Sequence, residues 1–246
     1  MYRFSTILVC VLLTVSQASG DPIVDRNVLF IGDSISTSSA SSRLSYGFEH
    51  VKNQRPDWTV AWQYASNSQN LLDALSSEPT SFYQGRDAIY FNTGLHSLVA
   101  TSELTHESLE TYEANLNQIV AKLKTLVDPG THLIWRSTTP IEAGASRGRD
   151  PLDVPIYNAV ASSVMTSHGI QIDDMYEFLL PLVGENAPGG NQYIVSDHTH
   201  WSTWAQETIL SPHVIETIES SAPEPTSGLL SGGLMALLFG RRFRRD

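Results

Sequence analysis

The chain has 246 residues, of which 41% are hydrophobic and 17% charged, and this suits one globular domain with a sizeable core. The composition excludes a largely disordered chain and a fibrous protein. Residues 21–220 hold ten Lys and Arg against 24 Asp and Glu with no basic stripe, so we expect no nucleic-acid partner.

The first segment, residues 1–20, has the layout of a secretory signal peptide. Arg3 precedes an apolar run over residues 7–15, and small residues follow up to Gly20. The alternative is a buried terminal strand or helix. The run is too short to span a bilayer, which favours export. Cys10 is the single cysteine, so the exported chain would have no disulfide, no cysteine nucleophile and no cysteine zinc site.

Short apolar segments alternate with helical patterns through residues 21–220, which we take as the central domain. Strands are predicted over 28–31, 59–64, 88–91, 133–135 and, most weakly, 170–172. Helices are predicted over 104–127, 155–168 and 202–217. This alternation predicts a three-layer α/β/α domain with a mostly parallel sheet, whose active site lies at the carboxyl ends of the strands. A loop is expected over 184–191.

Two motifs carry candidate chemistry. Ser34 stands in a Gly-Asp-Ser tripeptide directly after the first predicted strand, where a turn or helix-capping serine is the alternative. Asp197 precedes His200 by three residues, a spacing that lets a tight loop bring the carboxylate to the imidazole. A surface turn is one alternative for this second motif. Another is a metal site in which His198 and His200 act with Asp197 or His96.

Together these motifs resemble the SGNH or GDSL hydrolase family. FIGDSIS matches its first block and SDHTHWS its last, and the resemblance covers about residues 27–217. It implies a flavodoxin-like sheet of five parallel strands and no cofactor or metal. It also implies that Ser34 is the nucleophile, His200 its general base and Asp197 the acid that orients the base. We expect Asp33 to have a structural role in the turn.

The resemblance further implies an oxyanion hole, where this chain departs from the family pattern. The block FNTGLHSL places His96 where the family has asparagine, with Gly94 and Asn92 as further candidate donors. An imidazole N–H can also donate to an oxyanion. The block after the second strand has no glycine, so Asn67 is the candidate backbone donor beside the N–H of Ser34.

Three more blocks resemble a carbohydrate-directed branch of that family. They read IWRSTTP, YNAVA and IDDMY, at 134–140, 157–161 and 172–176. Arg136, in the first, has two equal interpretations: it contacts substrate or pairs with a core carboxylate.

The C-terminal segment, residues 221–246, resembles a PEP-CTERM sorting signal. Pro-Glu-Pro at 223–225 precedes an apolar stretch over 229–239 and a cluster of four arginines. The resemblance implies an exosortase-type processing enzyme as a partner and membrane contact through this segment alone. A helix packed on the domain is the alternative. We expect a location in the cell envelope, at the cell surface or in the extracellular matrix.

The sequence therefore predicts an exported serine esterase whose substrates are acyl esters. O-acetyl groups on an extracellular polysaccharide are the first substrate hypothesis, and a lipase or thioesterase of the same family is a variant of it. The alternative of another class is a non-catalytic, surface-displayed carbohydrate-binding protein that retains the fold.

Overall fold

The computed structural model describes residues 25–36, 49–100, 106–184 and 192–221. The expected signal peptide, residues 185–191 of the expected loop and residues 222–246 of the expected sorting segment lie outside the described residues. None of the helices in the described ranges is long and apolar enough to cross a membrane.

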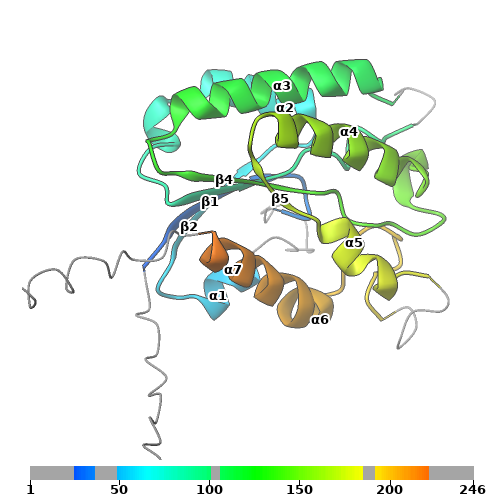
Figure 1. Cartoon of the computed structure of the whole chain (residues 1–246). Helices are drawn as coiled ribbons and strands as arrows, with labels where there is room; N and C mark the ends of the chain where they lie inside the picture. The colour runs from blue at the N-terminus through cyan, green and yellow to red at the C-terminus, as the bar shows by residue number, and fades with distance from the viewer. Residues whose placement is uncertain (1–24, 37–48, 101–105, 185–191, 222–246) are drawn as a thin grey trace, which may run out of the picture.

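A single parallel sheet of five strands forms the middle layer, in the order β2-β1-β3-β4-β5 (Figure 1). The strands are β1 Asn27–Gly32, β2 Thr59–Tyr64, β3 Ala88–Phe91, β4 His132–Arg136 and β5 Gln171–Asp173. This is the flavodoxin-like strand order, in which the chain switches direction between β1 and β3. The predicted fold class is confirmed, and all five predicted strands are present within a residue or two of their predicted bounds.

Helices cover both faces of the sheet, as Figure 1 shows. On one face lie α2 Ser68–Ser77, α3 Leu109–Leu126 and α4 Asp153–Ser167; on the other lie α1 Glu49–Gln54, α5 Met175–Leu179, α6 Thr203–Ala205 and α7 Ser211–Ser220. The π-helical segment η4 Gln206–Leu210 joins α6 to α7. The 3-10 turns are η1 Thr80–Phe82, η2 Ser146–Gly148 and η3 Leu180–Leu182.

The alternation of side chains along the strands builds two cores. Leu29 and Ile31 of β1 face the core beneath α2, α3 and α4, while Val28 and Phe30 face the core beneath α1 and α7. All four side chains are fully buried, as expected for a central strand of a parallel sheet.

The long helix α3 starts later than its apolar pattern predicts. Ser108 caps it, with Oγ accepting a hydrogen bond from the N–H of Thr111, so the helix begins at Leu109. The predicted start at residue 104 is therefore wrong by about a turn. The last predicted helix, 202–217, is interrupted by the π-helical segment η4. Apolar spacing alone does not reveal such a bulge.

Candidate active site

The serine turn begins where β1 ends. The N–H of Ile35 donates to Oδ1 of Asp33 at 2.9 Å, and the N–H of Ser36 donates to the carbonyl of Asp33 at 3.0 Å. A Cβ at Gly32 would lie 2.5 Å from Oγ of Ser36, so only glycine fits without moving this turn. Fully buried, Asp33 thus stabilises the turn that presents Ser34 at the carboxyl edge of the sheet.

The histidine lies at the end of a short hairpin. An isolated antiparallel bridge pairs Ile194 with Trp201, and the N–H of Val195 donates to the carbonyl of His200 at 2.8 Å. Oδ1 of Asp197 accepts from the N–H of His200 at 2.9 Å and from that of Thr199 at 3.0 Å. These bonds close the three-residue loop that the Asp-x-x-His spacing predicts.

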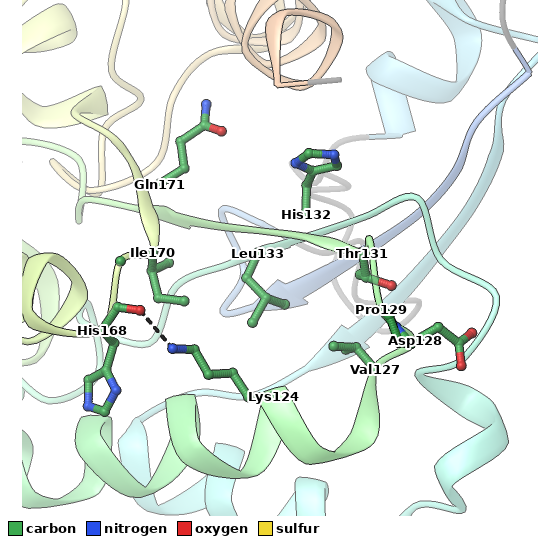
Figure 2. Close-up of a pocket in the computed structure, with 11 residues that line it drawn as sticks. Lys124, Val127, Asp128, Pro129, Thr131, His132, Leu133, His168, Ile170 and Gln171 are labelled. Atoms are coloured by element: carbon green, nitrogen blue, oxygen red, sulfur yellow. Dashed lines mark hydrogen bonds between the residues drawn. The ribbon is translucent and has the colours of Figure 1, made fainter. Parts of the chain in front are cut away.

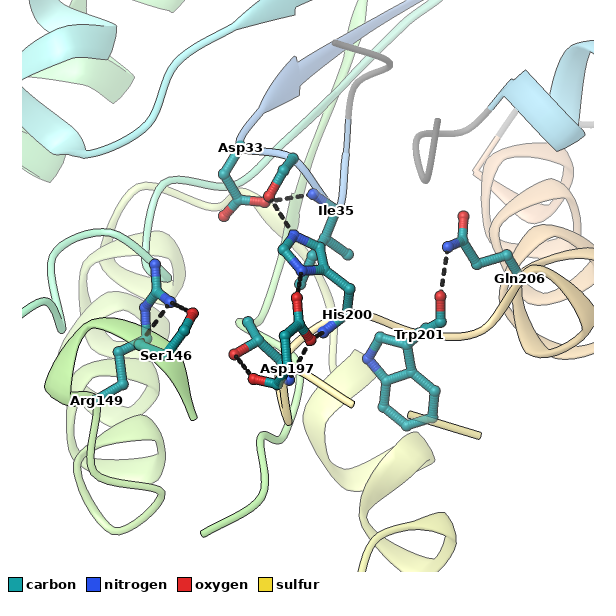
Figure 3. A network of polar contacts seen from close by, with 10 residues as sticks. Asp33, Ile35, Ser146, Arg149, Asp197, His200, Trp201 and Gln206 are labelled. Carbon is teal, nitrogen blue, oxygen red and sulfur yellow. Dashed lines mark hydrogen bonds and ion pairs between the residues drawn. The ribbon is translucent and has the colours of Figure 1, made fainter. Parts of the chain in front are cut away.

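The two motifs meet at hydrogen-bonding distance, although 166 residues separate them. Ser34 Oγ lies 2.7 Å from His200 Nε2, and His200 Nδ1 lies 2.5 Å from Asp197 Oδ2. Figure 3 shows Asp197 and His200 in this arrangement. A carboxylate only accepts, so Nδ1 carries the hydrogen and Nε2 is left to accept the Ser34 hydroxyl proton.

The environment of Asp197 keeps its carboxylate charged. Partial burial opposes ionisation, yet the N–H and imidazole of His200 and the N–H of Thr199 together hold the pKa of Asp197 below its usual value. The acid of this set is therefore ionised at neutral pH and can stabilise a protonated His200.

Two predicted oxyanion donors are already used inside the domain. The side-chain amide of Asn92 donates to the carbonyl of Arg136 at 2.7 Å and to Thr138 Oγ1 at 3.3 Å. The N–H of Gly94 donates to Oδ1 of Asn92 at 3.1 Å. Asn92 is fully buried, so in this conformation neither group is available to an oxyanion.

Three other candidate donors remain: the N–H groups of Ser34 and Asn67 and the imidazole of His96. No described residue accepts from either N–H group. Asn67 caps α2, with Oδ1 accepting from the N–H of Asn70 at 2.9 Å. Burial lowers the pKa of His96 despite the opposing charge of Asp33, and His200 also acts on it. His96 therefore lies within electrostatic reach of the base and is neutral at neutral pH.

Glu142, in the segment after β4, supports the histidine loop, the loop of residues 197–200. The sequence did not predict this contact. The N–H of Glu142 donates to the carbonyl of His198 at 2.9 Å, and Glu142 Oε2 lies 3.1 Å from His198 Nδ1. His198 has a left-handed backbone, with φ of +58°, which is uncommon for a residue other than glycine. No local pattern marks Glu142, because its role arises only from tertiary contact.

Arg136 is buried, and its Nη2 donates to Ser36 Oγ at 2.8 Å. It thus supports the serine turn from within the core. The two histidines of the metal-site alternative already have other partners. His198 contacts Glu142, and both ring nitrogens of His200 contact Ser34 and Asp197. Within the described ranges no group of three or more His, Cys, Asp or Glu side chains is arranged to hold a metal ion.

A cavity of about 560 Å³ lies at the opposite end of the sheet, where β4 and β5 begin (Figure 2). Lys124, His132, His168 and Gln171 are among its lining residues. Lys124 Nζ donates to the carbonyl of His168 at 2.7 Å, and His168 Nε2 contacts Asn117 Oδ1 at 2.9 Å. No serine or cysteine lines it, whereas Ser34 lies at the other end of the sheet.

No protein-family model and no curated protein sequence matches the chain. Solved structures do match its fold. A lipase/acylhydrolase from Enterococcus faecalis is 17% identical with a TM-score of 0.62, over 79% of this chain and 96% of that one. Axe2, an acetylxylan esterase from Geobacillus stearothermophilus, is 18% identical with a TM-score of 0.59, over 78% and 94%.

A GDSL-like lipase from Bacteroides thetaiotaomicron is 15% identical with a TM-score of 0.55, over 79% of this chain and 88% of that one. Each likeness spans nearly the whole of the other chain at low identity. The chain therefore shares the α/β fold of GDSL-like lipases and acetylxylan esterases.

Proposed function

We propose that the chain is a serine esterase that hydrolyses acyl esters through an acyl-enzyme. The observation that carries the proposal is the relay from Ser34 Oγ to His200 Nε2, at 2.7 Å, and from His200 Nδ1 to Asp197 Oδ2, at 2.5 Å. A serine hydroxyl is a weak nucleophile, and an oriented base activates it. The esterases and lipases that share the fold support the same reaction class.

In the proposed first step, Ser34 Oγ bonds to the ester carbonyl carbon while His200 Nε2 takes its proton. The carbonyl oxygen becomes an oxyanion, and the charge of Asp197 stabilises the imidazolium. The carbon–oxygen bond to the alcohol then breaks as His200 returns the proton to the leaving oxygen. Water repeats the sequence on acyl-Ser34, which releases the carboxylic acid and restores the hydroxyl.

The oxyanion hole of this proposal consists of the N–H groups of Ser34 and Asn67 and the imidazole of His96. Ser34 and Asn67 follow the neighbouring strands β1 and β2, and His96 follows β3. In a sheet of this strand order, the carboxyl ends of β1 and β3 flank the crevice where ligands bind. A neutral imidazole donates one N–H without bringing a second positive charge beside His200.

O-acetyl groups on an extracellular polysaccharide are the proposed substrate. The acetylxylan esterases among the structures of the same fold support this choice. The proposed export is consistent with such a substrate: we propose that residues 1–20 direct export and that an exosortase-type enzyme processes residues 221–246. Intact-mass measurement of protein from its native host tests this. A mass that includes the four C-terminal arginines contradicts the sorting proposal.

A fluorophosphonate probe tests the nucleophile. Wild type should take the label and Ser34→Ala should not, while ester hydrolysis falls by about 1000-fold or more. Ser196→Ala is the matched control, because Ser196 is exposed and directly precedes Asp197. Label on the Ser34→Ala protein would contradict the assignment. A folded wild type that takes no label would favour the carbohydrate-binding alternative.

p-Nitrophenyl esters of increasing chain length test the acyl group. The proposal expects the acetate to have the highest kcat/KM. A maximum at long acyl chains would instead favour a lipase.

A further inference from the structure

The segment between β4 and α4 contains a buried arginine that the triad does not use. Arg149 Nε donates to the carbonyl of Leu95 at 2.9 Å, and Nη1 donates to the carbonyl of Ser146 at 3.1 Å. Leu95 directly precedes His96, and the N–H of Ser146 donates to the carbonyl of Asp197 at 3.4 Å. Arg149 therefore connects the loop of His96 with the loop of Asp197, and Figure 3 shows its contact with Ser146.

One end of this guanidinium remains unused. Arg149 is 6% exposed, yet Nη2 has no acceptor among the described residues. No described carboxylate forms an ion pair with Arg149 or with its exposed neighbour Arg147. This is unusual, because a buried arginine is normally paired and acidic residues greatly outnumber basic ones in residues 21–220.

The backbone is strained at Arg147 and closely packed at Gly148. Arg147 and Gly148 have left-handed φ angles of +65° and +67°. The N–H of Ala100 donates to the carbonyl of Arg147 at 3.1 Å, and a Cβ at Gly148 would lie 1.9 Å from the Ala100 carbonyl oxygen. Such strain concentrates at functional sites, where the surrounding packing maintains it.

The charges of these arginines act on the candidate oxyanion donor. Burial is the main cause that lowers the pKa of His96, and Arg149 and Arg147 lower it further against the opposing charge of Asp33. Arg149 also interacts with Asp33 and Asp197. Both cations thus lie within electrostatic reach of the atoms that would surround a bound ester.

We propose that Arg149, assisted by Arg147, binds a carboxylate carried by the substrate, so that the enzyme prefers acidic esters to neutral ones. Acylated uronic acids in an acidic polysaccharide are one source of such a carboxylate, and a dicarboxylic acyl group is the other. With Nε and Nη1 already donating, Nη2 has a fixed direction and can form one charge-assisted hydrogen bond with a carboxylate oxygen. This inference rests on the proposed esterase activity.

Two matched ester pairs test the inference and distinguish the two sources. 4-Acetoxybenzoate against its methyl ester places the carboxylate on the alcohol side. Mono-4-nitrophenyl succinate against its methyl ester places it on the acyl side. The wild type should have the higher kcat/KM for the acidic member of one pair, and the preference should weaken as salt is raised. The pair that shows the preference identifies the source.

Arg149→Gln should reduce that acidic-to-neutral ratio of kcat/KM by about 10- to 100-fold, as loss of a charge-assisted contact predicts. Arg147→Gln should reduce it less, because Arg147 is exposed. Arg149→Lys retains the charge and guards against a folding defect; it should recover part of the ratio. Lys124→Gln removes a positive charge at the opposite end of the sheet and should leave the ratio unchanged.

The outcomes separate the two proposals. If wild type hydrolyses neutral and acidic esters alike, or if the ratio persists in folded Arg149→Gln and Arg147→Gln proteins, the carboxylate site is wrong while the esterase stands. If Lys124→Gln changes the ratio as strongly, bulk charge explains the preference and the site is again wrong. If no ester is hydrolysed, the esterase proposal fails and the inference fails with it.

Discussion

The two ends of the parallel sheet contain similar residue types and differ in how those residues meet. At the amino ends, Lys124 and His168 line a cavity of about 560 Å³, and their contacts end on a carbonyl and an amide. At the carboxyl ends, Ser34, His200 and Asp197 form one continuous relay. The carboxyl ends are therefore distinguished by a connected chain of proton donors and acceptors rather than by the volume of a cavity.

Breaking the relay at its acid should have the largest effect. Asp197→Asn keeps the size of the side chain but lets the amide donate to His200 Nδ1, which favours the wrong tautomer of the base. We expect kcat for ester hydrolysis to fall by about 10⁴-fold while the fold persists. Steady-state kinetics with circular dichroism checks this, and a folded variant within tenfold of wild type would contradict the relay.

Substitutions of His96 test whether the proposed site includes an oxyanion donor besides the relay of Ser34, His200 and Asp197. His96→Ala should lower kcat by about 100- to 1000-fold with little change in KM, because an oxyanion donor acts mainly in the transition state. His96→Asn should recover much of the loss by restoring an N–H donor.

If His96 is instead only a packed loop residue, His96→Ala lowers the melting temperature and leaves kcat near that of wild type. Comparing kcat with the melting temperature of both variants separates these accounts.

The sequence predicts contacts between near neighbours in the chain better than contacts between distant segments. The strands and the contact between Asp197 and His200 were predictable because each depends on a local pattern: a continuous apolar run for β1, and a spacing of three residues for Asp197 and His200. The hydrogen bond from Asn92 to the carbonyl of Arg136 was not predictable, because it joins the end of β3 to the neighbouring strand β4. The contacts of Arg149 and Glu142 were not predicted for the same reason: each joins segments that are distant in the sequence.

The contact between Glu142 and His198 should have a moderate effect, since Glu142 is a positioning residue that acts through the histidine loop. Glu142→Gln keeps the backbone bond to His198 and weakens the side-chain contact. We expect kcat to fall by about 10-fold, below the roughly 100-fold that a 1 Å misplacement can cost.

Glu142→Asp should recover less than full activity, because its carboxylate is one methylene shorter. Glu113→Gln on α3 is the matched control, since Glu113 is exposed. Equal losses of kcat in the Glu142 and Glu113 variants would contradict the positioning role.

A smaller effect concerns acid stability. Because the hydrogen bonds from His200 and Thr199 hold the pKa of Asp197 below its ordinary value in the folded protein, the unfolded chain binds more protons in acid. This stabilising contribution is present above about pH 4 and disappears as pH falls through the folded pKa. The difference in unfolding free energy between wild type and Asp197→Asn, measured by urea titration, should therefore shrink from pH 6 to pH 3. A constant difference would contradict the lowered pKa.

The smallest effect is expected at the opposite end of the sheet, where His168 caps α4 and its Nε2 contacts Asn117 Oδ1 at 2.9 Å. His168→Ala removes that hydrogen bond and part of the cavity lining. The free energy of unfolding should fall by about 1 kcal/mol, the usual net value of such a bond.

kcat and KM for ester hydrolysis should stay within twofold of wild type in His168→Ala, because the cavity lies beyond the amino ends of β4 and β5. Asn117→Ala removes the same bond from the other partner, together with the bond that Asn117 Nδ2 donates to the carbonyl of Glu113 at 2.9 Å, and should lower the stability at least as much. A folded His168→Ala protein with a large loss of kcat would contradict the assignment of the chemistry to the carboxyl ends alone. It would show that the two ends of the sheet are coupled.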